Sequence, residues 1–328
     1  MLHRRKKNSL FPPQETKLQA PAETLVAILL CTYNGARFLA EQLDSIEAQT
    51  HQQWFVVASD DGSSDKTLEV LLQYQAKWPP GRLLVRNGPQ HGFCLNFLSL
   101  ACDPTITADF YAFCDQDDVW LPTKLSTALN TLHSNHPVAV PNLYCGRTTY
   151  VDESLRKIGA SKPFKFPRTF RNALVQSIAG GNTMVFNAKT KECLEKIGIV
   201  QHTSHDWWLY QLVTGMGGLV HYDEVPQILY RQHSDSLVGG NTSILNKIER
   251  VSVVIKGQFR RWCDVNDSAL FHAESFLTND NKVTLDFFRL MRSAKFKDRL
   301  RLFEVVGLYR QTWQGTGSLF LAILLNKV

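Results

Sequence analysis

Three carboxylates stand within four residues at the end of an apolar segment. Asp115, Asp117 and Asp118 follow the run from Phe110 to Cys114, and residues 115–118 are called the acidic turn below. Acidic side chains this close repel one another unless a proton or a cation intervenes. Mg²⁺ and Mn²⁺ prefer oxygen ligands and are commonly held by one or two carboxylates together with nucleotide phosphates. The acidic turn therefore predicts a divalent-cation site, with helix capping from a solvated loop as the alternative.

A fourth carboxylate heads an aromatic segment. Asp206 lies between His205 and the pair Trp207–Trp208. In an apolar pocket a carboxylate loses solvation, so its pKa rises toward the range of a general base. The alternative is that Asp206 caps a helix whose tryptophans belong to the core. His202 and His205 have ligand-like spacing, but no cysteine is placed to complete a zinc site, so zinc is disfavoured.

Two further polar segments are candidates for ligand contact. The glycine pair Gly180–Gly181 would let the main chain approach a ligand or another strand, although an ordinary bend explains it equally well. His233 follows a strand predicted at 227–230 and would serve as a phosphate or metal contact. From the residues alone, a solvated loop histidine is the favoured interpretation of His233.

The segments that must position these residues alternate between two kinds. Continuous apolar runs predict strands at 24–31, 54–58, 82–86 and 109–114, and a further strand is expected over 142–151. Amphipathic spacing predicts helices that begin near residue 38 and span 67–77 and 94–101. This order predicts an α/β fold with a doubly wound, mostly parallel sheet flanked by helices. Ligands of such a sheet bind beyond the carboxyl ends of its strands. Residues 32–34, residues 60–61 and the acidic turn should therefore meet in one crevice that fits a nucleotide with its cation.

Several nucleotide-binding classes lack their motifs in this chain. No G-x-G-x-x-G follows the first predicted strand, and G-x-x-x-x-G-K-[ST] is absent, which disfavours dinucleotide oxidoreductases and P-loop enzymes. A nucleotidyltransferase would need a basic, glycine-rich phosphate loop where this chain has Thr32-Tyr-Asn-Gly35.

Composition places the chain among globular cytoplasmic proteins. Its 328 residues are 44% hydrophobic and 20% charged, which is enough for one large or two modest domains. The net charge of +6 is concentrated at residues 3–7 and 289–301, so we expect an anionic surface as a partner and no nucleic acid. Seven scattered cysteines without a C-x-x-C pair indicate reduced thiols. No apolar run reaches the roughly 18 residues of a membrane-spanning helix.

The composition also changes along the chain. Residues 1–22 are polar and basic and are expected to form a disordered leader, residues 23–242 form the α/β domain, and residues 243–328 form a helical region. Residues 295–310 are basic and amphipathic, and residues 319–325 are apolar but too short to span a bilayer. This region is expected either to lie on an anionic membrane or to pack against the domain or a second subunit.

Six segments in order between residues 25 and 241 resemble the inverting nucleotide-sugar glycosyltransferases of family 2, which have the GT-A fold. The chain is most similar to the bacterial rhamnosyltransferase-type members that build surface polysaccharides. The segments are Cys31-Thr-Tyr-Asn-Gly35, Ser59-Asp-Asp-Gly-Ser-Ser-Asp65, Asp115-Gln-Asp-Asp-Val-Trp120, Gly181-Asn-Thr-Met184, His205-Asp-Trp-Trp208 and Tyr230-Arg-Gln-His233. One departure is Cys94–Leu95, where many relatives have small or basic residues, and it leaves donor preference open.

The resemblance implies a role for each matching residue. The residues implied to hold the nucleotide sugar are Thr32, Tyr33, Asn34, Asp60, Asp61, Asn96, Asp115 and Gln116. Asp117 would bind Mg²⁺ or Mn²⁺, His233 would add a diphosphate or metal contact, and Asp206 would be the catalytic base.

The resemblance also implies the substrates. The donor would be a nucleotide-diphosphate sugar, with dTDP-rhamnose as the family-level expectation, and the acceptor a saccharide or a lipid-linked saccharide in cell-surface polysaccharide synthesis. The cysteines indicate a cytoplasmic protein. The basic C-terminal helices would suit a lipid-linked acceptor at the inner face of the plasma membrane, where the protein would be peripheral, or would offer a surface for homo-oligomers. The alternative is a non-catalytic nucleotide-sugar-binding partner in a polysaccharide assembly complex.

Overall fold

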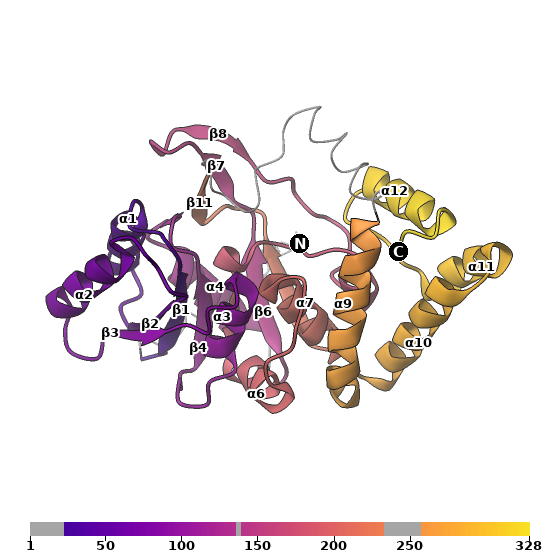
Figure 1. Ribbon diagram of the computed structural model, residues 1–328, viewed down its shortest axis with the longest axis horizontal. Helices are drawn as coiled ribbons and strands as arrows, with labels where there is room; N and C mark the ends of the chain where they lie inside the picture. The colour runs from indigo at the N-terminus through magenta and orange to yellow at the C-terminus, as the bar shows by residue number, and fades with distance from the viewer. Residues whose placement is uncertain (1–22, 136–138, 233–256) are drawn as a thin grey trace, which may run out of the picture.

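A seven-stranded sheet forms the centre of the protein, whose structure is a computed structural model that describes residues 23–135, 139–232 and 257–328 (Figure 1). Its strand order is β10-β6-β9-β4-β1-β2-β3. All neighbouring strands are parallel except β9, which runs antiparallel to both β4 and β6. The prediction of a doubly wound, mostly parallel sheet is therefore confirmed. The strands are β1 (Val26–Thr32), β2 (Trp54–Asp60), β3 (Leu83–Asn87), β4 (Phe110–Cys114), β6 (Asn142–Gly146), β9 (Val185–Asn187) and β10 (Leu219–Asp223).

Strand β1 shows why the sheet needs helices on both faces. All seven of its residues are buried. Alternate side chains join different cores: Val26, Ile28 and Leu30 pack in one hydrophobic cluster, and Ala27, Leu29 and Cys31 pack in the other. A strand that is apolar on both faces is stable only where each face is covered, as in α/β proteins.

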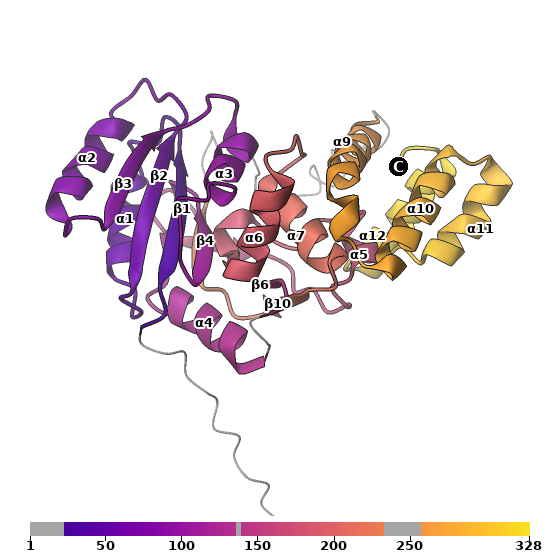
Figure 2. The ribbon, with the colours of Figure 1, turned by 90° about the horizontal axis from the view of Figure 1, so that it is seen from below.

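The flanking helices divide between the two faces of the sheet (Figure 2). One face is covered by α1 (Leu39–Glu47), α2 (Thr67–Lys77) and α4 (Lys124–Asn135), and the other by α3 (Phe93–Ala101), α6 (Ala188–Ile197) and α7 (His205–Gly215). Helix α2 has the bounds that the sequence predicts, and α3 begins one residue earlier than predicted.

A second, smaller sheet lies beside the first. Its order is β5-β11-β7-β8, and its strands are β5 (Val119–Trp120), β7 (Thr149–Val151), β8 (Lys157–Ala160) and β11 (Ile228–Arg231). The sequence suggests one strand over 142–151, which is wrong. Strand β6 ends at Gly146, whose α-carbon lies close to the main chain of Asp223. The chain then leaves the first sheet and enters the second sheet as β7. The acidic turn joins β4 to β5 and thereby connects the two sheets.

The C-terminal region is helical, and its helices gather at the end of the molecule away from α1 and α2 (Figure 1). They are α9 (Gln258–Ala273), α10 (Asn279–Ser293), α11 (Phe296–Val306) and α12 (Trp313–Leu324). The helix predicted over 295–310 ends earlier, because Gly307 adopts a left-handed φ of 67°. In the described ranges, no helix is both long and apolar enough to cross a membrane.

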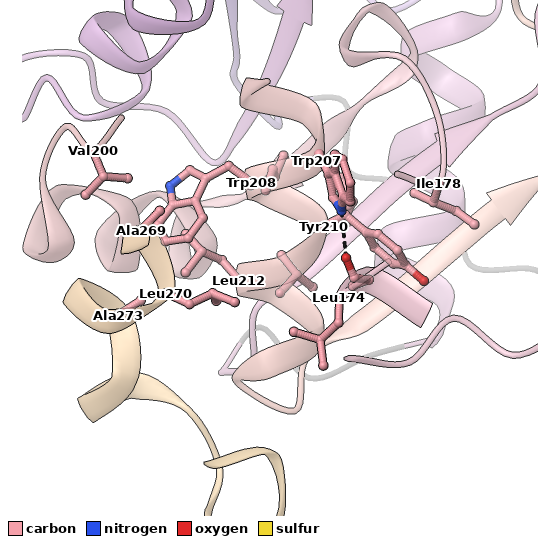
Figure 3. Packing of buried hydrophobic residues seen from close by; sticks show 14 of the residues in the cluster. Leu174, Ile178, Val200, Trp207, Trp208, Tyr210, Leu212, Ala269, Leu270 and Ala273 are labelled. Atoms are coloured by element: carbon pink, nitrogen blue, oxygen red, sulfur yellow. Dashed lines mark hydrogen bonds between the residues drawn. The ribbon is translucent and has the colours of Figure 1, made fainter. Parts of the chain in front are cut away.

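Helix α7 is held firmly between the α/β core and the C-terminal helices. Figure 3 shows Trp208 on the side of α7 that faces Ala269, Leu270 and Ala273 of α9. On another side, Trp207 Nε1 donates a hydrogen bond of 2.6 Å to the carbonyl oxygen of Ala173. The predicted leader and the predicted boundary at 242/243 lie outside the described residues, so the division into domains stays a prediction.

Candidate active site

The register of the central sheet brings three predicted polar segments together. In the parallel pairing of β1 with β2, Thr32 lies opposite Asp60, and in the pairing of β1 with β4, Leu30 lies opposite Cys114. The three strands therefore end at one edge. The Thr32 hydroxyl also donates a hydrogen bond of 2.8 Å to the Asp60 carboxylate.

Two buried carboxylates organise the loops at this edge. Asp60 accepts hydrogen bonds from the Ser63 hydroxyl at 2.6 Å and from the Ser63 N–H at 2.8 Å. Asp61 accepts from the N–H groups of Gln90 at 2.6 Å and Gly92 at 2.8 Å. Much of the acceptor capacity of both carboxylates is thus used within the protein. Their contacts fix the loops that follow β2 and β3.

The loop after β1 presents an aromatic ring to solvent. Asn34 has a left-handed φ of 48°, and its amide oxygen accepts a hydrogen bond of 2.8 Å from the Ser64 N–H. This contact joins the loop after β1 to the loop after β2. The preceding side chain, Tyr33, is 58% exposed, so its ring face is accessible to a flat ligand such as a nucleobase.

Two predicted ligand contacts are engaged with the main chain. The Gln116 amide accepts from the Tyr33 N–H at 2.8 Å and donates to the Tyr33 carbonyl at 2.9 Å. The Asn96 amide donates to the Ser59 carbonyl at 3.0 Å and accepts from the Ser59 hydroxyl. In the described structure both side chains position neighbouring segments. Direct contact of either with a nucleotide sugar stays a prediction.

Burial and mutual repulsion raise the pKa values of two carboxylates in the acidic turn. Burial, followed by the charges of Asp117 and Asp206, raises the pKa of Asp115 to about 8. Burial also raises the pKa of Asp118 well above its usual value. Asp118 is fully buried and accepts hydrogen bonds from the Asn182 amide and, at 3.1 Å, from the Arg231 N–H. Asp118 therefore supports the turn from inside.

Asp206 is the second residue of α7, and the N-cap of this helix is Ser204, so Asp206 does not occupy the capping position. Its carboxylate accepts from the Trp207 N–H and from the Ser204 hydroxyl. Burial raises the pKa of Asp206, and hydrogen bonds from Ser204, Trp207 and the Gly181 N–H oppose that rise. The negative charge of Asp206 contributes to the raised pKa of Asp115, so residues 91 positions apart in the chain belong to one electrostatic site.

The histidine beside Asp206 is a buried, neutral ring. His205 stacks on Phe97 with ring centroids 3.9 Å apart, and burial lowers its pKa to about 3. Burial lowers the pKa of His202 to about 4, although its Nε2 lies 2.9 Å from the Gln211 amide oxygen. A side chain at Gly181 would overlap His205 Nε2, which explains the glycine as a close main-chain approach. His233 lies outside the described residues.

Comparison with known proteins identifies the family. Residues 27–194, just over half of the chain, match the sequence model of glycosyl transferase family 2. The chain belongs to this family. This glycosyltransferase is 27% identical to the dTDP-rhamnosyl transferase RfbG of Shigella flexneri over 296 residues, which cover 85% of this chain and 100% of that relative. It is 25% identical to an uncharacterised glycosyltransferase of Rickettsia typhi over 72% of each chain.

A solved structure supports the fold of the glycosyltransferase. The crystal structure of S. aureus TarS residues 1–349 in complex with UDP-GlcNAc superposes with a TM-score of 0.51 at 14% identity. The superposition covers 85% of this glycosyltransferase and 79% of the TarS chain. The predicted GT-A fold and the predicted resemblance to rhamnosyltransferase-type members are thus confirmed.

Sequence reasoning assigned no role to two buried basic residues of the glycosyltransferase beside the acidic turn. Lys124 is fully buried, with its ammonium 3.3 Å from the centroid of the Trp120 ring, and burial lowers its pKa to about 7. Arg231 is 1% exposed and contacts the turn directly. Position in the chain offers little signal for either residue, because charged side chains are ordinarily exposed.

Proposed function

We propose that this glycosyltransferase transfers a sugar, with inversion, from a nucleoside-diphosphate sugar to a hydroxyl of a saccharide or lipid-linked acceptor. The observation that carries the proposal is that one short turn brings the surroundings of Asp115 and Asp206 together: Gly181 abuts His205 beside Asp206, and the next residue, Asn182, donates a hydrogen bond to Asp118 of the acidic turn. Asp115 belongs to a cluster suited to a cation and a diphosphate, and Asp206 heads a helix in a buried setting suited to a base.

The nucleotide would bind where β1, β2 and β4 end. We assign the stacking contact to Tyr33, since its ring is exposed while its main chain is held by Gln116. The residues assigned to the nucleotide-sugar site as a whole are Thr32, Tyr33, Asn34, Asp60, Asp61, Asn96, Asp115 and Gln116. Within this set, the hydrogen bonds of Asp60 and Asp61 support a role in shaping the loops that surround the ligand.

The acidic turn fits a hard divalent cation. A carboxyl whose pKa is raised to about 8 by burial and neighbouring charge, as at Asp115, gains stability as an anion when positive charge is supplied. Among the described residues no cluster of three or more ligating side chains encloses a metal, so diphosphate oxygens and water would complete the coordination. We assign the direct contact to Asp117, with His233 as a second candidate. Bound Mg²⁺ or Mn²⁺ would offset the charge that develops on the diphosphate.

Asp206 would accept the proton of the acceptor hydroxyl. As that proton moves to the carboxylate, the acceptor oxygen forms a bond to the anomeric carbon from the face opposite the diphosphate. The bond from the anomeric carbon to the diphosphate oxygen breaks, and the nucleoside diphosphate leaves with the electron pair. Burial raises the pKa of Asp206 and so increases its strength as a base, while the Trp207 N–H holds the carboxylate in place.

The similarity to a dTDP-rhamnosyl transferase supports rhamnose as the transferred sugar. Because the chain aligns with the whole of that relative, we extend the proposal to dTDP-rhamnose as donor and to the synthesis of a cell-surface polysaccharide. Other nucleotides and sugars are the alternatives that a donor panel separates.

We further propose that the C-terminal helices contact an anionic membrane. Val283, Phe287 and Leu290 of α10 are 52%, 37% and 52% exposed and follow one another at helical spacing, which puts them on one face. Two exposed lysines follow: Lys295 is the N-cap of α11, and Lys297 lies in its first turn. Apolar side chains together with lysines favour the surface of a bilayer with acidic lipids. A second copy of the chain is the alternative occupant of this face.

The first experiment is a thermal-shift screen of nucleotide sugars, with and without Mn²⁺, followed by a transfer assay. A ligand that binds only the folded state stabilises it by RT ln(1 + [L]/Kd), so about 2.7 kcal/mol is expected at one hundred times Kd. A Mn²⁺-dependent shift with one donor, accompanied by transfer, supports the proposal. Binding without transfer to any acceptor would instead favour a non-catalytic partner of a polysaccharide assembly complex.

A further inference from the structure

Arg231, the last residue of β11, is a buried arginine whose contacts converge on the acidic turn. Its Nε donates to the carbonyl oxygen of Asp117 at 2.9 Å, and its own N–H donates to the Asp118 carboxylate at 3.1 Å. Its Nη1 donates to the carbonyl oxygen of Glu153 at 2.5 Å. Its Nη2 pairs with the Glu41 carboxylate at 2.7 Å. One side chain thus joins α1, the acidic turn and the segment between β7 and β8.

The cost of burying a guanidinium makes this arrangement informative. Arg231 is 1% exposed, whereas Glu41, its ion-pair partner, lies at the surface. A buried charge is tolerated only when it is paired and its hydrogen-bonding groups are satisfied. The planar fork meets that condition with one carboxylate and two main-chain carbonyls, and the guanidinium also lies 4.3 Å from the centroid of the Phe38 ring. A lysine carries its three donors on one nitrogen, so it cannot reach three acceptors that Arg231 contacts from three different nitrogens.

The contacts of Arg231 bracket one residue of the acidic turn. The Arg231 Nε–H binds the carbonyl of Asp117, and the Arg231 main-chain N–H binds the side chain of Asp118. The main chain that directly follows the α-carbon of Asp117 is therefore fixed. We infer that Arg231 is the positioning residue that holds Asp117 in place for its divalent cation. This inference rests on the proposed function, because it takes Asp117 as the cation ligand.

The test is direct Mn²⁺ binding to the purified full-length chain, measured by electron paramagnetic resonance, for wild type and the variant Arg231→Lys. Residues that orient a metal ligand typically contribute about 10–100-fold to metal affinity. We expect the Mn²⁺ Kd of Arg231→Lys to rise by about that factor. The melting temperature of the metal-free protein is measured in parallel, so that lost stability is separated from lost affinity.

A matched control is Arg299→Lys. Arg299 is also buried and donates to two main-chain carbonyls, those of Ile323 and Ala294, but it lies in the C-terminal helices. We expect this variant to lose stability and keep the wild-type Mn²⁺ Kd. A second variant, Glu41→Gln, keeps a hydrogen-bonding group at the far end of Arg231 and removes the ion pair. We expect a smaller rise in Mn²⁺ Kd for it than for Arg231→Lys.

The outcomes separate the inference from the proposal on which it rests. If wild type binds Mn²⁺ and both Arg231→Lys and Glu41→Gln bind it with the same Kd, Arg231 has only a structural role and the inference is overturned. If wild type itself binds no Mn²⁺ with or without a donor nucleotide, the cation part of the proposed function fails, and the inference fails with it. A selective loss of affinity in the Arg231 variant, absent from Arg299→Lys, supports both.

Discussion

The amide of Gln116 forms a pair of hydrogen bonds with the main chain of Tyr33, at 2.8 Å to its N–H and 2.9 Å to its carbonyl. These bonds attach the acidic turn, which follows β4, to the loop that follows the neighbouring parallel strand β1. Gly35 belongs to the same contact, because a side chain there would overlap the Gln116 amide. The exposed Tyr33 ring and the proposed cation site are consequently coupled through one glutamine.

Replacing Gln116 with Glu should weaken nucleotide binding. The carboxylate keeps an acceptor for the Tyr33 N–H but faces the Tyr33 carbonyl without a donor, so the loop that carries the ring is displaced. We expect about a tenfold rise in Kd for the preferred nucleoside diphosphate, or roughly 1.4 kcal/mol. Isothermal titration with UDP, GDP and dTDP measures it. Gln53→Glu, the same change at an exposed residue before β2, is the control. Equal affinities in the two variants would contradict the coupling.

Replacing Asp206 with Asn should abolish most turnover and spare donor binding. The amide oxygen still accepts from the Trp207 N–H, but the group no longer takes a proton. Loss of a general base typically reduces the rate by roughly 10²–10⁴-fold, which is the fall in kcat that we expect in a transfer assay. Asp280→Asn offers a matched control, since Asp280 holds the second position of α10 as Asp206 does in α7. Normal transfer by Asp206→Asn would show that the base lies elsewhere.

The buried histidines should make the fold sensitive to acid. The folded-state pKa values of His202 and His205, about 4 and about 3, lie below the value of about 6.5 in an unfolded chain. The unfolded state therefore binds more protons at these residues as pH falls, and their contribution to the free energy of unfolding declines from pH 6.5 downward. Each histidine contributes a slope of up to about 1.4 kcal/mol per pH unit.

The raised pKa of Asp115 has the opposite effect on the free energy of unfolding. Between about pH 4 and pH 8 the folded state holds a proton on Asp115 that the unfolded state lacks, so this residue's contribution increases as pH falls. The test therefore compares slopes between variants. Urea unfolding of wild type and His205→Phe between pH 6 and pH 4 should give slopes that differ by about 1.4 kcal/mol per pH unit. Identical slopes would mean that His205 is protonated in the folded protein.

The exposed face of α10 should bind acidic lipid. Burying one valine or phenylalanine side chain is worth about 1.5–3 kcal/mol, so the double variant Val283→Ser with Phe287→Ser should lose at least about tenfold in vesicle partitioning. Sedimentation with phosphatidylglycerol vesicles measures it. Leu72→Ser, at an exposed apolar residue of α2 at the other end of the molecule, should have no effect. A dimeric wild type that the double variant converts to monomers, with partitioning unchanged, would assign the face to self-association.

Much of the fold follows from local patterns in the sequence. The apolar run of β1 and the amphipathic spacing of α2 specify both elements, and parallel strands then bring residues 32, 60 and 115 to one edge. The break between β6 and β7 and the antiparallel direction of β9 depend on pairing with distant strands, which no local pattern encodes. The buried charged residues of the site likewise depend on distant partners. Arg231 is stable in the core because of Glu41, 190 residues earlier in the chain, and its burial cannot be inferred from its neighbours.

One short segment holds the proposed base and the proposed cation site at a fixed separation. Within the 3₁₀ turn Gly181–Thr183, Gly181 abuts His205 next to Asp206, while Asn182 donates to Asp118 inside the acidic turn. The separation of the base from the cation site is therefore set by adjacent residues of the main chain. Mutations that broaden acceptor choice in this protein should accordingly arise outside this turn, because a change within it would displace the base and the cation site together.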